Sequence, residues 1–155
     1  MNADAGPWLN VLLCQAGSLA CAVPVLHVAE TMRPLRIESL RGVPPFVSGM
    51  SIVRGVSVPV IDLAQLLGNE TGAKKSRFVL VKVGTRSVAL AVDGVIGVRR
   101  LESATMSALP PLLRGASAEF VSAIGLLDDQ LLVVLESGTI VPDAVWTRVS
   151  SGGQA

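Results

Sequence analysis

Short apolar runs separated by glycine, proline and polar residues recur along the whole sequence. In three places two such runs flank a tight turn, which is the pattern of a β-hairpin. Strands do not alternate with long helical patterns, so the sequence predicts an all-β barrel or sandwich with about nine or ten short strands. The three hairpins are expected from 8–15 and 19–25, from 78–83 and 87–92, and from 120–127 and 131–135.

Near the middle of the chain, the stretch 42–61 holds a single charged residue, Arg54. The pattern there predicts two strands, Met50–Val53 and Val56–Ile61, joined by a turn at Arg54-Gly55. Arg54 has three interpretations: a solvated turn residue, an internal brace for the fold, or a forked contact to a carboxylate or carbonyl of a partner.

A short helix is expected to begin directly after these strands, at Asp62. The Asp62 carboxylate would accept hydrogen bonds from the first turn, and Gln65 follows three residues later, as in a capping box. Gly68 is expected to end the helix. Asp62 is therefore interpreted as a helix cap and not as a catalytic acid.

The remaining segments are more polar or are interrupted by proline. A length of 155 residues is that of about one domain, so we expect one domain spanning 1–155. Residues 26–41 should form a strand or turn as far as Met32 and then cross the molecule, because Pro34 breaks any helix there. Elsewhere we expect a surface loop (69–77), a long excursion (101–118), a short helix or tail (138–149) and flexible ends (1–7 and 150–155).

Composition narrows the function classes. The chain has 155 residues, with 13 basic and 12 acidic side chains and a net charge of +1. This balance argues against a broad electrostatic surface for nucleic acid or anionic lipid. Aromatic residues make up only 3% of the chain, which disfavours base stacking. Because the leader lacks basic residues and no apolar span is long enough for a membrane helix, we expect a cytoplasmic protein.

The nucleophilic and metal-ligating residues are few. His27 is the single histidine, so a two-histidine zinc site is excluded. If Gly17-Ser18 is the loop of the first hairpin, Cys14 and Cys21 lie opposite each other, either as small apolar residues of a reduced interior or as a redox pair. No third group is evident that would orient a Cys–His nucleophile. We expect no enzyme activity, no metal and no cofactor.

The segment 43–68 resembles the hallmark stretch of the bacterial CheW-like family. That stretch has a proline, then an aromatic residue, a glycine, an Arg-Gly pair and a Pro-x-x-Asp-Leu motif at fixed spacing. The matching residues are Pro44, Phe46, Gly49, Arg54, Gly55, Pro59, Asp62 and Leu63.

The resemblance extends to Val28-Ala29-Glu30 and to 88–95, and it covers about residues 9 to 146. The chain departs from the family at Ile52-Val53, where the family usually has Asn-Leu, and at Cys21-Ala22, where it usually has an aromatic-Gly pair. The departures indicate a divergent CheW paralogue with its own set of partners.

The resemblance implies a fold and a function. The fold would be two intertwined five-stranded SH3-like barrels with one or two short helices. The function would be that of a non-catalytic adaptor between the cytoplasmic helical hairpin of chemoreceptors and the regulatory domain of a CheA-type histidine kinase. The alternative is a stand-alone regulatory module that binds another signalling protein or a small ligand.

The same resemblance assigns candidate site residues. Those expected to contact partners are Arg54, Glu30, Val28, Gly49 and Val98, and those expected to be structural are Asp62, Pro59 and Gly55.

Overall fold

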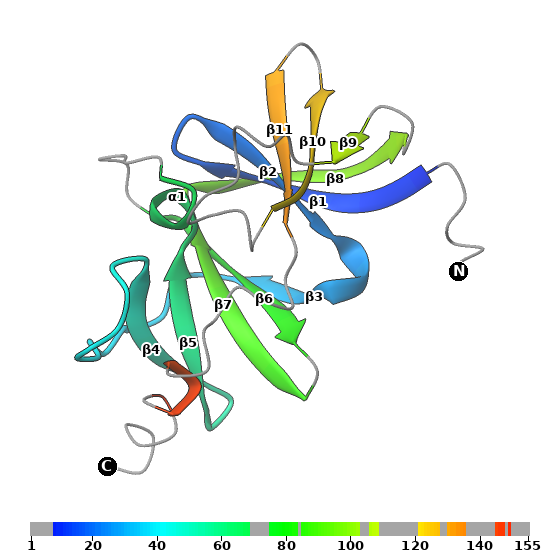
Figure 1. Ribbon diagram of the computed structural model, residues 1–155. Coiled ribbons are helices and arrows are strands. Elements are labelled where there is room, and N and C mark those ends of the chain that lie inside the picture. Colours follow the sequence, from blue (N-terminus) through cyan, green and yellow to red (C-terminus); the bar gives the residue numbers. More distant parts are fainter. Residues whose placement is uncertain are drawn as a thin grey trace.

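Two curved β-sheets make up the protein, one above the other in the view of Figure 1. The chain starts in the upper sheet, passes to the lower one after β2, and returns after β7. The structure is a computed structural model that describes residues 8–68, 75–83, 85–102, 106–108, 121–127, 130–135, 145–147 and 149.

The six-stranded sheet, which we call the first barrel, has the order β8-β1-β2-β11-β10-β9. Its pairs are antiparallel except for β2 and β11, which run parallel. It therefore combines strands from both ends of the chain. Its strands are β1 (Trp8–Ala16), β2 (Leu19–Pro24), β8 (Gly94–Glu102), β9 (Met106–Ala108), β10 (Val121–Leu127) and β11 (Gln130–Leu135).

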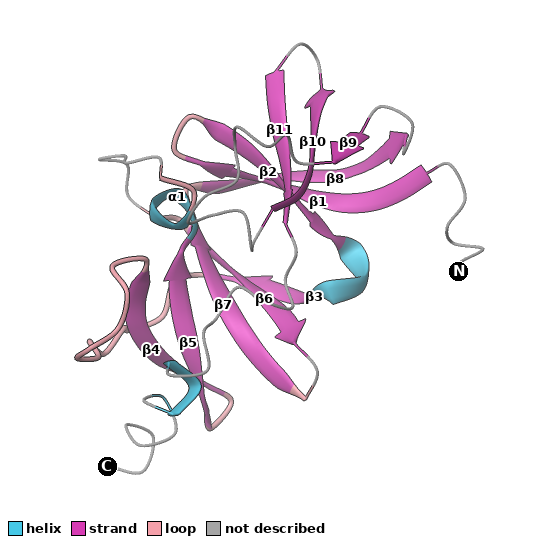
Figure 2. Cartoon of the chain, viewed as in Figure 1, coloured by secondary structure: helices cyan, strands magenta, loops and turns pink. Residues whose placement is uncertain are grey.

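The five-stranded sheet, which we call the second barrel, has the order β3-β6-β7-β5-β4. The described helices are short, and among them are the 3-10 helix η2 (Val25–His27) before β3 and α1 (Leu63–Leu66) after β5 (Figure 2). The strands of this barrel are β3 (Val28–Met32), β4 (Val47–Val53), β5 (Val56–Asp62), β6 (Arg77–Val83) and β7 (Arg86–Val92).

On several strands the side chains of both faces are buried, each face in a different apolar cluster. Along β7, Ala89 and Ala91 join the interior cluster of the second barrel, while the alternating residues Val88, Leu90 and Val92 join a cluster that both barrels share. We call this second cluster the shared core. Strand β1 divides in the same way, with Leu12 and Cys14 in the shared core and Val11 and Leu13 in a separate cluster. The alternation of strand side chains thus explains why nearly every position of β7 is apolar.

The predicted all-β, two-barrel fold is confirmed, with differences at the ends of strands. The first barrel has six strands where five were expected, because β9 lies within the predicted excursion and pairs with β10. Strand β4 begins at Val47 instead of Met50, and β6 begins at Arg77 instead of Phe78, since pairing with a neighbouring strand extends both. Arg86 pairs with Val83, so this hairpin loop is shorter than predicted. The expectations for 1–7, for most of 69–77 and 109–120, and for 150–155 concern residues outside the described ranges.

Asp93 fixes the crossover from β7 to β8. One oxygen of its carboxylate accepts a hydrogen bond from the Gly17 N–H at 2.9 Å, and the other accepts one from Lys75 Nζ at 2.8 Å. Partial burial by itself lowers the pKa of Lys75, but its hydrogen bond to Asp93 and the charges of Asp62 and Asp93 outweigh this and raise it. The crossover is thereby tied to the first hairpin and to the chain entering β6.

Gly49 lies where a connecting segment crosses β4. Its φ angle is +148°, and the backbone of Glu38 pairs with the neighbouring Met50. A Cβ atom added at Gly49 would lie 2.1 Å from the Glu38 carbonyl oxygen, far inside the contact distance. The side chain of any other residue would separate this segment from the sheet.

We therefore expect Gly49→Ala to lower the free energy of unfolding by about 3 kcal/mol or more, from backbone strain and steric overlap together. Gly55→Ala is the matched control, because Gly55 also has a positive φ of +80° but has open space around it. This variant should lower the free energy of unfolding by about 1–2 kcal/mol, because only the backbone strain of an L-residue at positive φ is added. Urea denaturation measures both variants, and equal losses would contradict the steric explanation.

Cys14 and Cys21 are directly paired across β1 and β2, as the hairpin pattern predicted. Both are free thiols with no exposed surface. Burial raises the pKa of Cys14 to about 12, and it raises the pKa of Cys21 further, with a smaller contribution from the charge of Cys14. The structure therefore places them as apolar residues of the shared core, while their redox state stays untested.

Because thiolates and not thiols react with disulfide reagents, both cysteines should be inert in the folded protein. At about pH 8 we expect a colorimetric disulfide reagent to label the native chain at least ~100-fold more slowly than the chain unfolded in guanidinium chloride. A native thiol that reacts as fast as an unfolded one would restore the redox-pair interpretation.

Candidate partner-binding site

Arg54 occupies a strained position in the turn between β4 and β5. Its φ is +50°, and it is the one residue other than glycine with a positive φ among those the structure describes. Gly55 follows with φ +80°, and Val53 pairs with Val56 on either side. Two successive positive φ angles are typical of a type I′ turn, whose first position usually holds Asn, Asp or Gly. A long cationic side chain is thus held where the backbone disfavours it.

The Arg54 side chain extends to β3 and forms an ion pair with Glu30. Nη2 donates to Glu30 Oε1 at 2.9 Å, and Nη1 donates to Oε2, so that the guanidinium and carboxylate meet in a two-pronged pair. β3 is one edge of the five-stranded sheet, and the β4–β5 hairpin forms the other. The ion pair therefore links the two edges and helps to close the second barrel.

The pair remains accessible to solvent. The side chain of Arg54 is 71% exposed and that of Glu30 is 31% exposed. The hydrogen bond from Arg54 lowers the pKa of Glu30, and the same bond together with the negative charge raises the pKa of Arg54. Both groups are therefore charged at neutral pH. A guanidinium has five N–H donors, so the donors that Glu30 does not use are available to a partner.

A hollow of about 690 Å³ lies beside Arg54, between the β4–β5 turn and the β6–β7 turn. Its walls include Val58 and Leu80 of the barrel interior, and Trp146 lines another side. The Arg86 guanidinium stacks over the Trp146 ring, 4.7 Å from its centroid. The site thus combines apolar walls with two guanidinium groups, a composition common at the energetic centres of protein interfaces.

The structure separates the five predicted partner residues into two surfaces and one interior position. Arg54 and Glu30 form the ion pair. Val28 is half-buried on β3 against the shared core, and Val98 is exposed on β8, opposite Leu12 of that core. Gly49 is buried beneath Glu38, so it has a packing role, and its contact with a partner stays a prediction.

The three residues expected to be structural lie along β5 and its turn. Asp62 accepts a hydrogen bond from the Gln65 N–H at 3.2 Å at the start of α1. Pro59 pairs with Met50 of the edge strand β4 and lies outside the β5–β7 pairing, which covers Val60 onwards. A missing N–H there interrupts no bond to the central strand.

Two arginine–tryptophan contacts that the structure shows on the surface were not identified by the sequence analysis. Arg86 and Trp146 meet through a contact between distant parts of the chain, and the same holds for Arg100 and Trp8. Arginine and tryptophan separated by sixty or more residues form no recognisable motif. Only the register of the strands brings Arg100 beside Trp8.

The part of the chain that the structure describes holds neither a metal-ligand cluster nor a helix that could span a membrane. Three or more histidine, cysteine, aspartate or glutamate side chains do not gather there in a group that could hold a metal ion. No helix there is long and apolar enough to cross a bilayer.

The ion pair makes the protonation of Glu30 depend on Arg54. We expect Arg54→Ala to raise the pKa of Glu30 toward its ordinary value of 4.5, because the hydrogen bond and the positive charge are lost. A ¹³C NMR pH titration of the Glu30 carboxyl carbon measures this, with Arg41→Ala as a control. Because folding lowers the pKa of Glu30, the ion pair stabilises the folded state at pH values above the ordinary pKa of 4.5. This stabilisation is lost as the pH falls through the lowered pKa of the folded state. An unchanged Glu30 titration would contradict the geometry.

Known proteins resemble this chain in both sequence and structure. The chemotaxis protein CheW of Klebsiella aerogenes is 24% identical over 127 residues, covering 81% of this chain and 76% of that protein. Protein FrzA of Myxococcus xanthus is 30% identical over 120 residues, covering 76% and 74%. The crystal structure of the scaffolding protein TtCheW from Thermoanaerobacter tengcongensis has a TM-score of 0.75 at 22% identity, covering 85% of this chain and 91% of that one.

The structural likeness supports the fold, and the sequence comparison identifies the family. The profile of the CheW-like domain family matches residues 10–145, which is most of the chain. The resemblance in 43–68 is thereby confirmed, and this chain belongs to the CheW-like domain family.

Proposed function

We propose that this chain is a cytoplasmic adaptor that couples the helical hairpin at the tip of chemoreceptors to the regulatory domain of a CheA-type histidine kinase. The observation that carries the proposal is the Arg54–Glu30 pair at the open end of the second barrel. Family membership supplies the class of function, a chemotaxis scaffold. The exposure and contacts of Arg54, Val28 and Val98 support the choice of a surface for each partner.

The turn at Arg54 has the properties of a contact with another folded domain. Ile52 and Val56 lie two residues on either side of Arg54, and they are 53% and 61% exposed. When a partner covers apolar side chains that surround a guanidinium, water is excluded from the centre of the contact. Glu30 already holds the guanidinium in place, so binding loses little side-chain entropy. We assign this surface to the kinase regulatory domain.

We place a second surface on Val28 and Val98. Val28 of the second barrel packs against the shared core, and Val98 of the first barrel, which is 61% exposed, pairs with Leu12 of that core. An amphipathic helix could lay its apolar side over such a strip. We assign this surface to the receptor hairpin, so that the two partners are held by different parts of one rigid module.

A stand-alone regulatory module that binds another signalling protein or a small ligand remains the second candidate. The hollow beside Arg54, with Arg86 and Trp146 in its walls, is the observation that favours it. Binding of the kinase domain distinguishes the two candidates, because the stand-alone module has no need of that contact.

The test is a calorimetric titration of the chain with the regulatory domain of a CheA-type kinase from the same organism. We expect saturable binding in the micromolar range for the wild type. Arg54→Ala should weaken it about tenfold or more, because a forked, charge-assisted contact is lost. Arg41→Ala, an exposed arginine in the segment before β4, is the matched control and should bind like the wild type.

The stability of each variant separates the explanations. Arg54→Ala should melt close to the wild type, since an exposed ion pair contributes little to folding. A collapse of its melting temperature would make Arg54 structural. If the folded wild type does not bind the kinase domain at all, the adaptor proposal is wrong and the stand-alone module replaces it.

A further inference from the structure

One face of the first barrel extends beyond the shared core at the start of β1. Leu12 is buried in that core and pairs with Val98 of β8. Two residues toward the N-terminus, Asn10 pairs with Arg100, and two further on, Trp8 pairs with Glu102. Because side chains two residues apart share a face, Trp8, Asn10, Val98 and Arg100 continue the face of Leu12 outward into solvent. We call these four residues the Trp8 patch.

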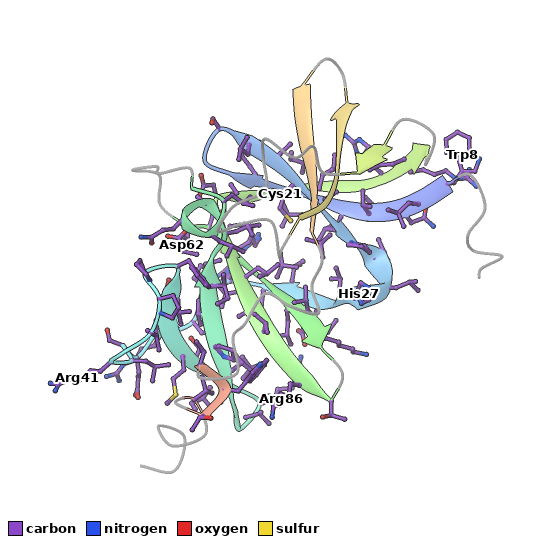
Figure 3. All side chains as sticks on the ribbon, in the orientation of Figure 1. Trp8, Cys21, His27, Arg41, Asp62 and Arg86 are labelled. Atoms are coloured by element: carbon purple, nitrogen blue, oxygen red, sulfur yellow. The ribbon has the colours of Figure 1, made fainter. Side chains whose placement is uncertain are left out.

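The tryptophan at the end of this patch is exposed and is held in place. Trp8 is 46% exposed. The Arg100 guanidinium lies over its ring, 5.2 Å from the ring centroid, in the diagonal position across the two strands. Figure 3 shows Trp8 at the far end of β1, directed away from the second barrel. An exposed aromatic ring that is already ordered contributes large contact area at small entropic cost.

The patch also carries the positive charge of Arg100. Glu102, which pairs with Trp8, belongs to the same face by register, and its side chain lies outside the described part of the structure. Arg100 has its stacking contact and no ion pair with the described carboxylates. The next residue in sequence, Arg99, is exposed and donates to the carbonyl oxygen of Val98 at 3.2 Å, but alternation places it on the opposite face of β8, outside the patch. Stacking on an aromatic ring leaves the charge and most N–H donors of a guanidinium available. The patch therefore offers an apolar ring beside an available binding site for a carboxylate.

From this combination we propose that the Trp8 patch selects among partner helices by requiring an acidic residue. In the bound state an apolar side chain of the helix packs on Trp8 and Val98, and a carboxylate about one turn away forms a forked pair with Arg100. The Trp8 patch includes Val98, which also belongs to the surface that we assigned to the receptor hairpin. The inference therefore rests on that assignment. It adds the feature that would distinguish one receptor from another.

The test uses soluble coiled-coil fusions of receptor tip hairpins from the same genome. Each hairpin is made in its native form and in an amide form, in which every Asp or Glu within two turns of the tip is replaced by Asn or Gln. Calorimetry gives the affinities for the wild type, Trp8→Ala and Arg100→Ser. In a Trp146→Phe background, Trp8 is the one remaining tryptophan, so its emission reports directly whether the helix covers it.

We expect Trp8→Ala and Arg100→Ser each to bind the native hairpin about tenfold or more weakly than the wild type. The amide hairpin should lose a similar factor with the wild type and little more with Arg100→Ser, because the carboxylate and Arg100 act as a pair. Trp8 emission should shift to the blue on binding. Arg41→Ser and Leu35→Ala are matched controls and should bind like the wild type, and Figure 3 labels Arg41 at the opposite end of the molecule from Trp8.

The outcomes separate the inference from the function on which it rests. If the wild type binds the hairpin and both patch variants bind equally well, the inference is wrong and the receptor assignment stands. If the wild type binds no hairpin, the receptor assignment fails, and the inference fails with it. If light scattering shows that the wild type self-associates and Trp8→Ala is monomeric, the patch is an interface between copies of this chain, which also overturns the proposal.

Discussion

The shared core between the two sheets is the constraint on which the remaining structure depends. Several strands, among them β1 and β7, have two apolar faces, one packed within their own barrel and one packed in the shared core. Among the described residues, charged side chains lie on the edge strands β3 and β8, near the ends of other strands, and in turns and connecting segments. This is why the charged groups that matter, Arg54, Glu30 and Asp93, are found at the edges and crossovers of sheets.

Closure of the second barrel and presentation of a binding group are combined in one contact. Glu30 links β3 to the opposite edge of the sheet and at the same time orients the Arg54 guanidinium toward solvent. The strained backbone of Arg54 is difficult to explain as a requirement of the turn, because asparagine or glycine would form it with less strain. A requirement for the guanidinium itself is the simpler explanation.

Local features of this molecule could be predicted from the sequence, and contacts between distant residues could not. The turn at Arg54-Gly55, the pairing of Cys14 with Cys21 and the helix after Asp62 depend on patterns a few residues long. The partnership of Arg54 with Glu30 depends on which strands form the edges of the sheet. The packing role of Gly49 requires the crossing of Glu38, and the extra strand β9 requires β10. None of these leaves a periodic signal.

The parallel pairing of β2 with β11 has a consequence for the order in which the chain folds. Every strand of the second barrel is available once synthesis has passed Val92. Strand β2 pairs early with β1, but it meets its second neighbour only when Leu132 of β11 pairs with Ala20, after β10 and β11 have been made. Until then the β2 edge of the first hairpin has no neighbouring strand. The second barrel is the natural nucleus, and the first barrel, which holds the Trp8 patch, is completed last.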